Sequence, residues 1–239
     1  MPAFSGALEL GFRYIETDVH LSRDGHLVVF HDEGLERTTD GRGRIRDFTL
    51  SELERLDAGY GFSPDGRSHP WRGAGLRVPT LAQVFELSPT VALNVEMKQS
   101  GVGLPRVLWD FIEARGLHDR ILVASAEQEL GKEFRAIARG RVATSASARE
   151  AFELWAAARV GGAALVPIAY DALQLPPFYY RLEVITERLL RAAHARGVQV
   201  HAWTIDDPDE MRRLLALGVD GLMTDRPDLL LQVVRESSR

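Results

Sequence analysis

Hydrophobic and polar positions alternate along this chain with two different periods. Short runs rich in β-branched and aromatic residues are followed by longer segments whose apolar residues recur every three or four positions. This alternation is typical of repeated β–α units around a parallel sheet. The predicted strands are Tyr14–Val19, Leu27–Phe30, Val91–Met97, Ile121–Ser125, Arg141–Thr144, Ala163–Pro167, Val198–Thr204 and Gly221–Thr224. The predicted helices are Ala3–Leu10, Leu50–Leu56, Leu81–Leu87, Leu104–Arg115, Gln128–Arg139, Ala148–Arg159, Ile185–Arg196, Pro208–Leu217 and Pro227–Glu236.

Two segments do not follow this rhythm. Residues 59–77 are rich in Gly, Pro, Arg and Trp and are predicted to form a long functional loop, while residues 167–181 form a second irregular stretch. We find no internal repeat beyond the β–α rhythm. The pattern therefore predicts one α/β domain over residues 1–239, with a small hairpin and loop insertion around residues 20–78.

Composition narrows the class of protein. The chain has 239 residues, close to the roughly 250 of a single α/β barrel. A net charge of −5 argues against a nucleic-acid partner, and the absence of cysteine excludes disulfides and thiolate metal sites. No apolar run approaches the ~20 residues that span a bilayer, so no stable membrane insertion is expected. The first residues lack the features of a signal peptide, which favours a cytoplasmic location and leaves open a longer, exported form.

Two of the predicted strands carry acidic residues on one face. Glu16 and Asp18 are separated by one residue, as are Glu96 and Lys98, so each pair points to the same side of its strand. Carboxylates directed into a barrel are costly unless they are paired or bind a metal, and oxygen ligands favour Mg²⁺, Ca²⁺ or Mn²⁺. The alternative is a structural one, in which the acids cap loops or pair with Arg13 or Lys98.

A histidine follows the next short apolar strand. Asp24-Gly25 forms a tight turn, and His31 comes at the end of the run that begins at Leu27. Histidine is suited to general acid–base chemistry near neutral pH. His20 and His26 are predicted to be ordinary surface histidines beside the hairpin, and His201 a hydrogen-bonded core residue.

Taken together, the motifs resemble one known family. They are Ile15-Glu16-Thr17-Asp18-Val19, Asp24-Gly25, Val28-Val29-Phe30-His31-Asp32, Arg37-Thr38-Thr39-Asp40-Gly41, Leu56-Asp57-Ala58-Gly59, Val78-Pro79-Thr80-Leu81, Asn94-Val95-Glu96-Met97-Lys98, Ala202-Trp203-Thr204-Ile205-Asp206 and Gly218–Pro227. In this order and over nearly the whole chain, they resemble the glycerophosphodiester phosphodiesterases.

The resemblance implies a TIM barrel that hydrolyses glycerophosphodiesters, small-molecule substrates, to an alcohol and glycerol 3-phosphate with Mg²⁺ or Ca²⁺. By motif, Glu16, Asp18 and Glu96 correspond to the metal ligands and His31 to one of two catalytic histidines. Lys98 corresponds to a phosphate contact, and Trp203 to an aromatic residue of the substrate pocket.

The chain departs from the family pattern at two places. A central strand ends in Ser125-Ala126 instead of the usual Ser-Phe, which alters one apolar wall of the pocket. The family also opens with a strand bearing His-Arg-Gly, whereas this chain begins within the following helix. We therefore expect a barrel that lacks its first strand, the partner of His31 and a phosphate-binding arginine, and that has low activity.

Two other functions stay open at this point. One is a catalytically impaired or inactive barrel that still binds metal or ligand, which the missing segment favours. The other is a phospholipase-D-like lyase, which shares the barrel and the metal chemistry. The sequence does not decide the preferred headgroup, the identity of the metal or the oligomeric state.

Overall fold

The computed structural model describes residues 1–237, which form two compact units. The first unit comprises Met1–Ile121 with Ala136–Arg139, and the second comprises Leu122–Arg135 and the described chain from Gly140 onwards. The elements of the first unit are α1 (Pro2–Glu9), β1 (Tyr14–Leu21), β2 (Leu27–Val29), η1 (Ile45–Asp47), α2 (Leu50–Leu53), α3 (Leu81–Glu86), β3 (Ala92–Met97), α4 (Leu104–Arg115) and η2 (His118–Arg120).

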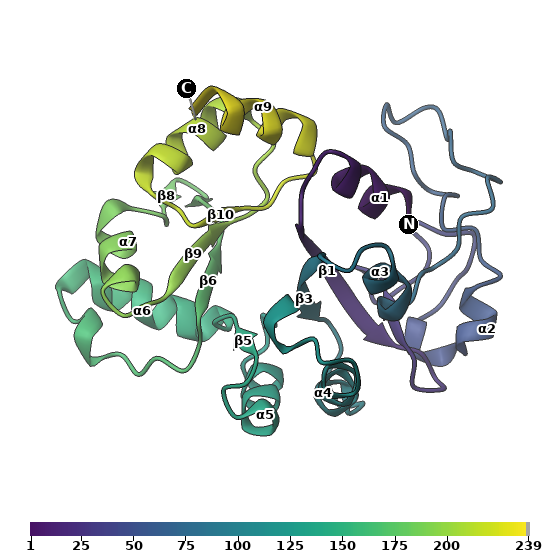
Figure 1. The fold of residues 1–239 in the computed structure, drawn as a ribbon, viewed down its shortest axis with the longest axis horizontal. Helices are drawn as coiled ribbons and strands as arrows, with labels where there is room; N and C mark the ends of the chain where they lie inside the picture. Colours follow the sequence, from purple (N-terminus) through teal and green to yellow (C-terminus); the bar gives the residue numbers. More distant parts are fainter. Residues whose placement is uncertain (238–239) are drawn as a thin grey trace. The chain divides into compact units, whose positions relative to one another are not determined.

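In the first unit, β1 lies between two partners in its sheet (Figure 1). It pairs in parallel with β3, from Tyr14 opposite Ala92 to Val19 opposite Met97, and antiparallel with β2 through a tight hairpin. Along β3, Leu93, Val95 and Met97 are buried and alternate with polar positions. This period-two alternation fixes the register, because a slip by one residue would turn the apolar side chains out of the core.

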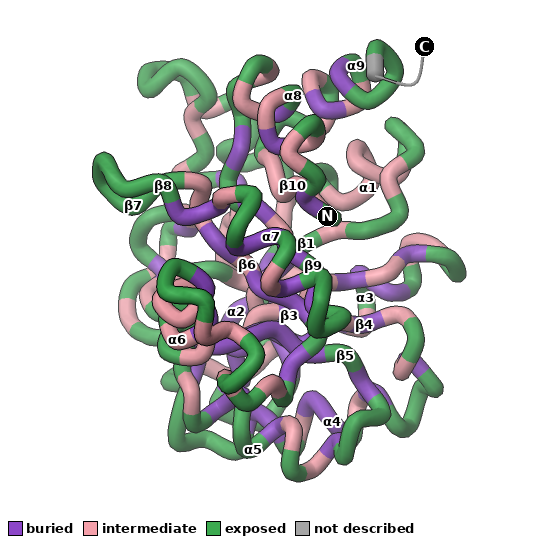
Figure 2. The backbone as a smooth tube through the Cα atoms, turned by 90° about the vertical axis from the view of Figure 1, so that its left-hand side faces the viewer, coloured by how far each residue is buried: buried purple, intermediate pink, exposed green. Residues whose placement is uncertain are grey.

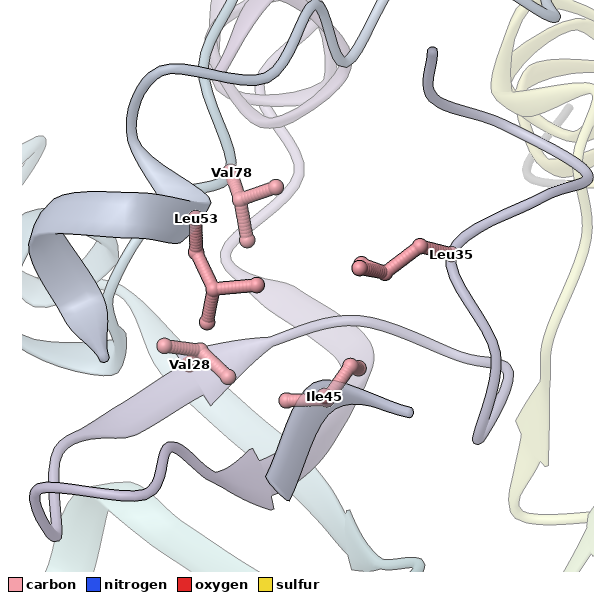
Figure 3. Close-up of a cluster of buried hydrophobic side chains, with 5 residues drawn as sticks. All are labelled: Val28, Leu35, Ile45, Leu53 and Val78. Carbon is pink, nitrogen blue, oxygen red and sulfur yellow. The ribbon is translucent and has the colours of Figure 1, made fainter. Parts of the chain in front are cut away.

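The insertion around residues 20–78 has a small apolar core of its own. Val28, Leu35, Ile45, Leu53 and Val78 are at most 1% exposed and point toward one another (Figure 3). Burial of such side chains contributes roughly 1.5–3 kcal/mol each, which is enough to hold a segment that has little regular secondary structure. The residues between β2 and η1 are thereby anchored at both ends.

The long loop of residues 59–77 packs against itself and against the backbone of Arg37 and Thr38, which lie earlier in the insertion. Arg72 lies over the ring of Tyr60 and donates a hydrogen bond to the Tyr60 carbonyl, 3.0 Å away. Gly61 has no room for a side chain, because a Cβ atom there would clash with the backbone carbonyl of Arg37. The Gly61 N–H also donates to the Thr38 carbonyl at 3.3 Å.

The second unit continues the β–α rhythm. Its elements are β4 (Ile121–Ala124, which starts at the unit boundary), α5 (Gln128–Ala138), β5 (Ala143–Thr144), α6 (Ala148–Val160), η3 (Ala163–Leu165), β6 (Ala172–Leu175), β7 (Phe178–Tyr179), β8 (Leu182–Glu183), α7 (Glu187–His194), β9 (Gln199–Ala202), α8 (Pro208–Leu217), β10 (Gly221–Leu222) and α9 (Pro227–Ser237).

The parallel strands of this unit neighbour one another in chain order. β4 pairs with β5, a bridge between Ser145 and Ala172 joins the end of β5 to β6, and β6 pairs with β9, which pairs with β10. The helices α6, α7 and α8 lie on one side of β6, β9 and β10 (Figure 1), and the strand segments are largely buried (Figure 2). Sequential parallel strands with covering helices are the arrangement of (β/α) barrels.

Local signals set the helix ends. Thr49, Thr80 and Ser147 cap α2, α3 and α6, each in a reciprocal capping box with the residue three positions on. Glycines end two of the helices: Gly116 and Gly218 adopt φ of 60° and 97° directly after α4 and α8. Of the described helices, none has the length and apolar character needed to cross a membrane.

One predicted strand is wrong. The run predicted at 163–167 begins with a 3-10 turn, η3 (Ala163–Leu165), in which Leu165 is 87% exposed, and the strand lies later, at Ala172–Leu175. The second irregular stretch therefore contains β6 and the start of the β7–β8 hairpin. The run after Gly161-Gly162 matched a strand in composition, but the run at 172 binds both Ser145 and β9 in the sheet. Of the two short apolar runs, the one that has pairing partners in the sheet forms the strand.

Helix α6 allows a matched test of the second unit's core. Leu154 is fully buried, whereas Phe152 in the same helix is 62% exposed. We expect Leu154→Ala to lower the free energy of unfolding by about 2–5 kcal/mol, because it removes buried methyl groups and leaves a cavity. Phe152→Ala should cost less than about 1 kcal/mol. Urea denaturation measures both, and equal losses would contradict the packing described here.

Candidate active site

Strands β1 and β3 bring three carboxylates together. Their parallel register places Glu16 opposite Asn94 and Asp18 opposite Glu96. One oxygen atom from each of Glu16, Asp18 and Glu96 lies within 4.8 Å of the other two. Like charges directly opposite each other destabilise a sheet unless something compensates them. The cluster therefore needs positive charge.

Lys98 supplies part of this charge. Its Nζ lies 3.1 Å from Asp18 Oδ1 and 2.8 Å from Glu96 Oε2, and all three side chains are at most about a quarter exposed. Burial raises the pKa of Asp18, and the charge of Glu96 adds to this, while the Lys98 ammonium partly offsets it. Burial alone would lower the pKa of Lys98, but the hydrogen bond to Glu96 and the attraction of both acids raise it. The structural alternative for Asp18, an ion pair with Lys98, is thus realised.

The donor set also fits a hard divalent cation. Three carboxylates and one ammonium leave an excess of negative charge, and every potential ligand atom in the cluster is an oxygen. Mg²⁺ and Ca²⁺ prefer such ligands, whereas Zn²⁺ favours nitrogen and sulfur. The side chains of Glu16, Asp18 and Glu96 are close enough to share one ion after small rotamer changes.

His31 is tied to the same end of β1. The N–H of Phe30 donates to the carbonyl of Asp18 at 3.1 Å, so His31 follows immediately after a backbone contact with the acidic cluster. The imidazole is 65% exposed, and its Nδ1 donates to Asp32 Oδ1 at 2.6 Å. Because Nδ1 is engaged, Nε2 is the ring nitrogen that is left to exchange a proton with a bound molecule.

Asp32 is itself held by an arginine. Arg37 binds it with two hydrogen bonds, Nε to Oδ2 at 2.5 Å and Nη2 to Oδ1 at 2.9 Å. The hydrogen bonds from Arg37 and then His31 keep the pKa of Asp32 far below its usual range. Asp32 is therefore ionised at neutral pH and orients the imidazole. Neither residue was assigned a role from the sequence, although Asp32 directly follows His31 and Arg37 comes five residues after Asp32.

His20 has a different position from the one predicted. It was expected at the surface, but it is 1% exposed, and burial lowers its pKa, so the ring is neutral. Nε2 donates to the backbone carbonyl of His31 across 3.3 Å. The prediction was wrong because the buried strand β1 extends to Leu21, two residues beyond its predicted end. His20 is a support for the His31 segment.

The other aromatic and histidine candidates lie in the second unit. Trp203 follows β9 and is 43% exposed, and its backbone N–H donates to the carbonyl of Leu175 at 3.2 Å. Its role as a substrate contact stays a prediction. His201 is half-buried beside Gln174 and Gln199, 3.5 and 3.1 Å away, in keeping with a structural histidine.

These features define a class of protein. Repeated β–α units, an acidic cluster where two parallel strands end, and a histidine oriented by a carboxylate are the parts of an α/β hydrolytic enzyme of the barrel type. The sequence matches the model of the Glycerophosphoryl diester phosphodiesterase family over residues 1–229. The chain belongs to this family, and it is an enzyme of the phosphodiesterase class.

Known proteins agree with this placement. The glycerophosphodiester phosphodiesterase of Caldanaerobacter subterraneus subsp. tengcongensis is 34% identical over 239 residues, covering 98% of this chain and 90% of the relative. A glycerophosphoryl diester phosphodiesterase domain from Mycobacterium tuberculosis superimposes with a TM-score of 0.82 at 18% identity, covering 97% and 91%. An Oleispira antarctica phosphodiesterase, solved with its product sn-glycerol-3-phosphate, gives 0.73 at 24% identity, covering 97% and 89%. The fold is therefore of the TIM-barrel class, as predicted.

The acidic cluster makes a direct binding prediction. Asp18→Asn removes one ligand charge, so we expect the Kd for Mn²⁺ or Ca²⁺ to rise at least about tenfold in calorimetric titration. Glu86→Gln is the matched control, because it removes one negative charge from an exposed position on α3. Equal weakening by both variants would show that the ion is attracted by general charge and not held by the cluster.

Proposed function

We propose that this enzyme hydrolyses glycerophosphodiesters to an alcohol and glycerol 3-phosphate with the help of one divalent cation, Mg²⁺ or Ca²⁺. The observation that carries the proposal is the convergence of Glu16, Asp18 and Glu96 beside Lys98. The product bound to the Oleispira antarctica relative, sn-glycerol-3-phosphate, supports the same substrate class. The net charge of −5 favours a small diester over a nucleic acid.

In this proposal, the three carboxylates hold the cation, which when bound neutralises charge on the phosphoryl oxygens. Lys98 contributes a second positive charge from the same face. Its Nζ is now shared between Asp18 and Glu96, and a cation on these carboxylates would leave the ammonium available to a phosphate oxygen. Trp203 is assigned to the wall of the substrate site on the strength of its motif and its partial exposure.

His31 carries the proton in this proposal. The Asp32 carboxylate fixes the proton on Nδ1, so Nε2 accepts a proton from the attacking oxygen or, once protonated, donates one to the leaving oxygen. Arg37 keeps Asp32 in place and ionised. Asp32 and Arg37 are positioning residues, since they act on the substrate only through the imidazole.

The proposal is tested by product analysis with glycerophosphocholine as substrate. After treatment with EDTA, release of glycerol 3-phosphate should fall to the background rate and return when Mg²⁺ or Ca²⁺ is added, because the carboxylates alone repel the phosphate. Glu96→Gln should stay inactive after the metal is restored. Full activity in EDTA would contradict metal dependence, and a cyclic phosphate product would identify a lyase.

The histidine clamp predicts a separate result. Asp32→Asn should lower kcat at least about tenfold, because the imidazole tautomer with its proton on Nε2 is no longer disfavoured. KM should change little, because the proposed cation and phosphate contacts remain. Asp47→Asn, an exposed acid elsewhere in the insertion, is the control. A variant Asp32→Asn with a raised KM and normal kcat would place Asp32 in substrate binding.

A further inference from the structure

A hairpin in the second unit exposes a group of aromatic side chains. Strands β7 and β8 are joined by a two-residue turn, Tyr180-Arg181, with Tyr179 opposite Leu182. Tyr179 is 64% exposed and Tyr180 90% exposed, and about half of each of Phe178 and Leu182 is exposed as well. The turn stands out as an exposed loop (Figure 2). We call Phe178–Leu182 the aromatic tip.

The base of this hairpin is held firmly. Arg213 of α8 pairs with the Glu183 side chain at 3.0 Å and lies over the Phe178 ring, while Arg159 of α6 donates to the Glu183 carbonyl at 2.8 Å. The N–H of Val184 donates to the Pro177 carbonyl at 2.8 Å. Contacts with two helices thus fix the base of the hairpin. The fold therefore holds the aromatic tip in its exposed position.

The turn has a backbone conformation that its residue disfavours. Tyr180 has φ of 53°, a left-handed value at the turn position where glycine is usual. A non-glycine residue is disfavoured there, because its Cβ comes too close to the following carbonyl oxygen. The only ring against which Tyr180 packs is that of Tyr179, at 4.9 Å among the described contacts, and its side chain is almost wholly in water. The strain is not offset by burial within this chain.

The charge of the aromatic tip is also one-sided. No acidic residue occurs between Asp171 and Glu183, and Arg181 makes no ion pair within the part of the chain that the structure describes. The tip therefore combines two phenol rings, two apolar side chains and one unpaired cation. Tyrosine and arginine in this combination suit the boundary between lipid headgroups and acyl chains, where a ring can be buried while its hydroxyl stays hydrated.

We propose that the aromatic tip docks this protein reversibly on the surface of a phospholipid bilayer. A small convex tip needs no complementary shape in a fluid interface, whereas the exposed parts of four side chains fall short of the ~800 Å² that each partner of a stable protein complex buries. The hairpin directly follows the carboxyl end of β6, and the Leu175 carbonyl binds the N–H of Trp203 at that same edge. The docking surface thus follows the end of β6 beside which Trp203, the proposed substrate contact, also lies.

Vesicle co-sedimentation tests the proposal without any need for catalysis. Wild-type protein should bind vesicles of phosphatidylcholine, and it should bind those that also contain phosphatidylglycerol more tightly. The double variant Tyr179→Ser/Tyr180→Gly should partition at least about tenfold more weakly into both, because it removes two interfacial rings. It should remain folded, since glycine accepts the φ of Tyr180, and its thermal midpoint should not fall.

Two further variants separate the contributions. Arg181→Gln should retain binding to phosphatidylcholine but lose most of the gain from phosphatidylglycerol, about fivefold for one cation near an anionic surface. Phe152→Ala removes an aromatic side chain from α6 that is 62% exposed, close to the 64% of Tyr179, and this variant should bind like the wild type.

Three outcomes would overturn the proposal. They are wild-type binding no stronger than that of the double variant, an equal loss in Phe152→Ala, and a wild-type dimer in sedimentation velocity that the double variant abolishes while neither form binds vesicles. The last would assign the aromatic tip to a second copy of this chain. Because the readout is partitioning, failure here leaves the proposed phosphodiesterase chemistry untouched.

Discussion

The repulsion between Asp18 and Glu96, side by side on two parallel strands, is the constraint on which the site depends. The position of both acids is fixed, because the opposite faces of the two strands are buried. Val19, Val95 and Met97 set the register that places the acids against each other. Hydrophobic burial thus holds together charges that would otherwise separate. Lys98 makes the arrangement tolerable in the absence of a cation, since it bonds to both acids. A cation has to compete with this ammonium, so its affinity depends on how readily the lysine turns to another anion. A phosphate group on the proposed substrate would be such an anion, and metal binding would then be coupled to substrate binding.

The acid–base group is supported from a separate source. His31 lies in a segment with little regular structure, yet its surroundings are fixed at three levels. The Phe30 N–H binds the Asp18 carbonyl, buried His20 holds the His31 carbonyl, and Asp32 with Arg37 orients the ring. The apolar core of the insertion anchors the whole segment from Val28 to Ile45. Sheet and insertion therefore position different groups: the sheet positions the acidic cluster and Lys98, and the insertion positions His31, to which we assign the proton transfer.

Much of this was predictable from residue patterns. The E-x-D and E-x-K pairs predicted same-face carboxylates because side-chain direction in a strand follows from spacing alone. The starts of α2 at Thr49 and α3 at Thr80 are set by capping chemistry, which is local and can therefore be read from the sequence. What sequence reasoning missed depends on contacts between distant segments. The strand at Ala172–Leu175 is defined by its partners at Ser145 and in β9, and nothing in Ala-Leu-Gln-Leu distinguishes it from the apolar run at 163. The Asp32–Arg37 clamp lies in a loop without periodicity, and the burial of His20 depends on where β1 ends.

The close approach of Gly61 to the Arg37 carbonyl has a mechanical consequence. The loop of residues 59–77 and the segment that orients His31 share a backbone contact and the hydrogen bond from Gly61 to Thr38. A displacement of the loop is therefore transmitted to that segment. If the loop swings outward, that hydrogen bond breaks and Arg37 loses the backbone support next to its side chain. Motion of the loop would then reach the Asp32–Arg37 pair and change the direction of the His31 imidazole. Loop grafts from relatives would accordingly disturb the orientation of His31 as well as the loop itself.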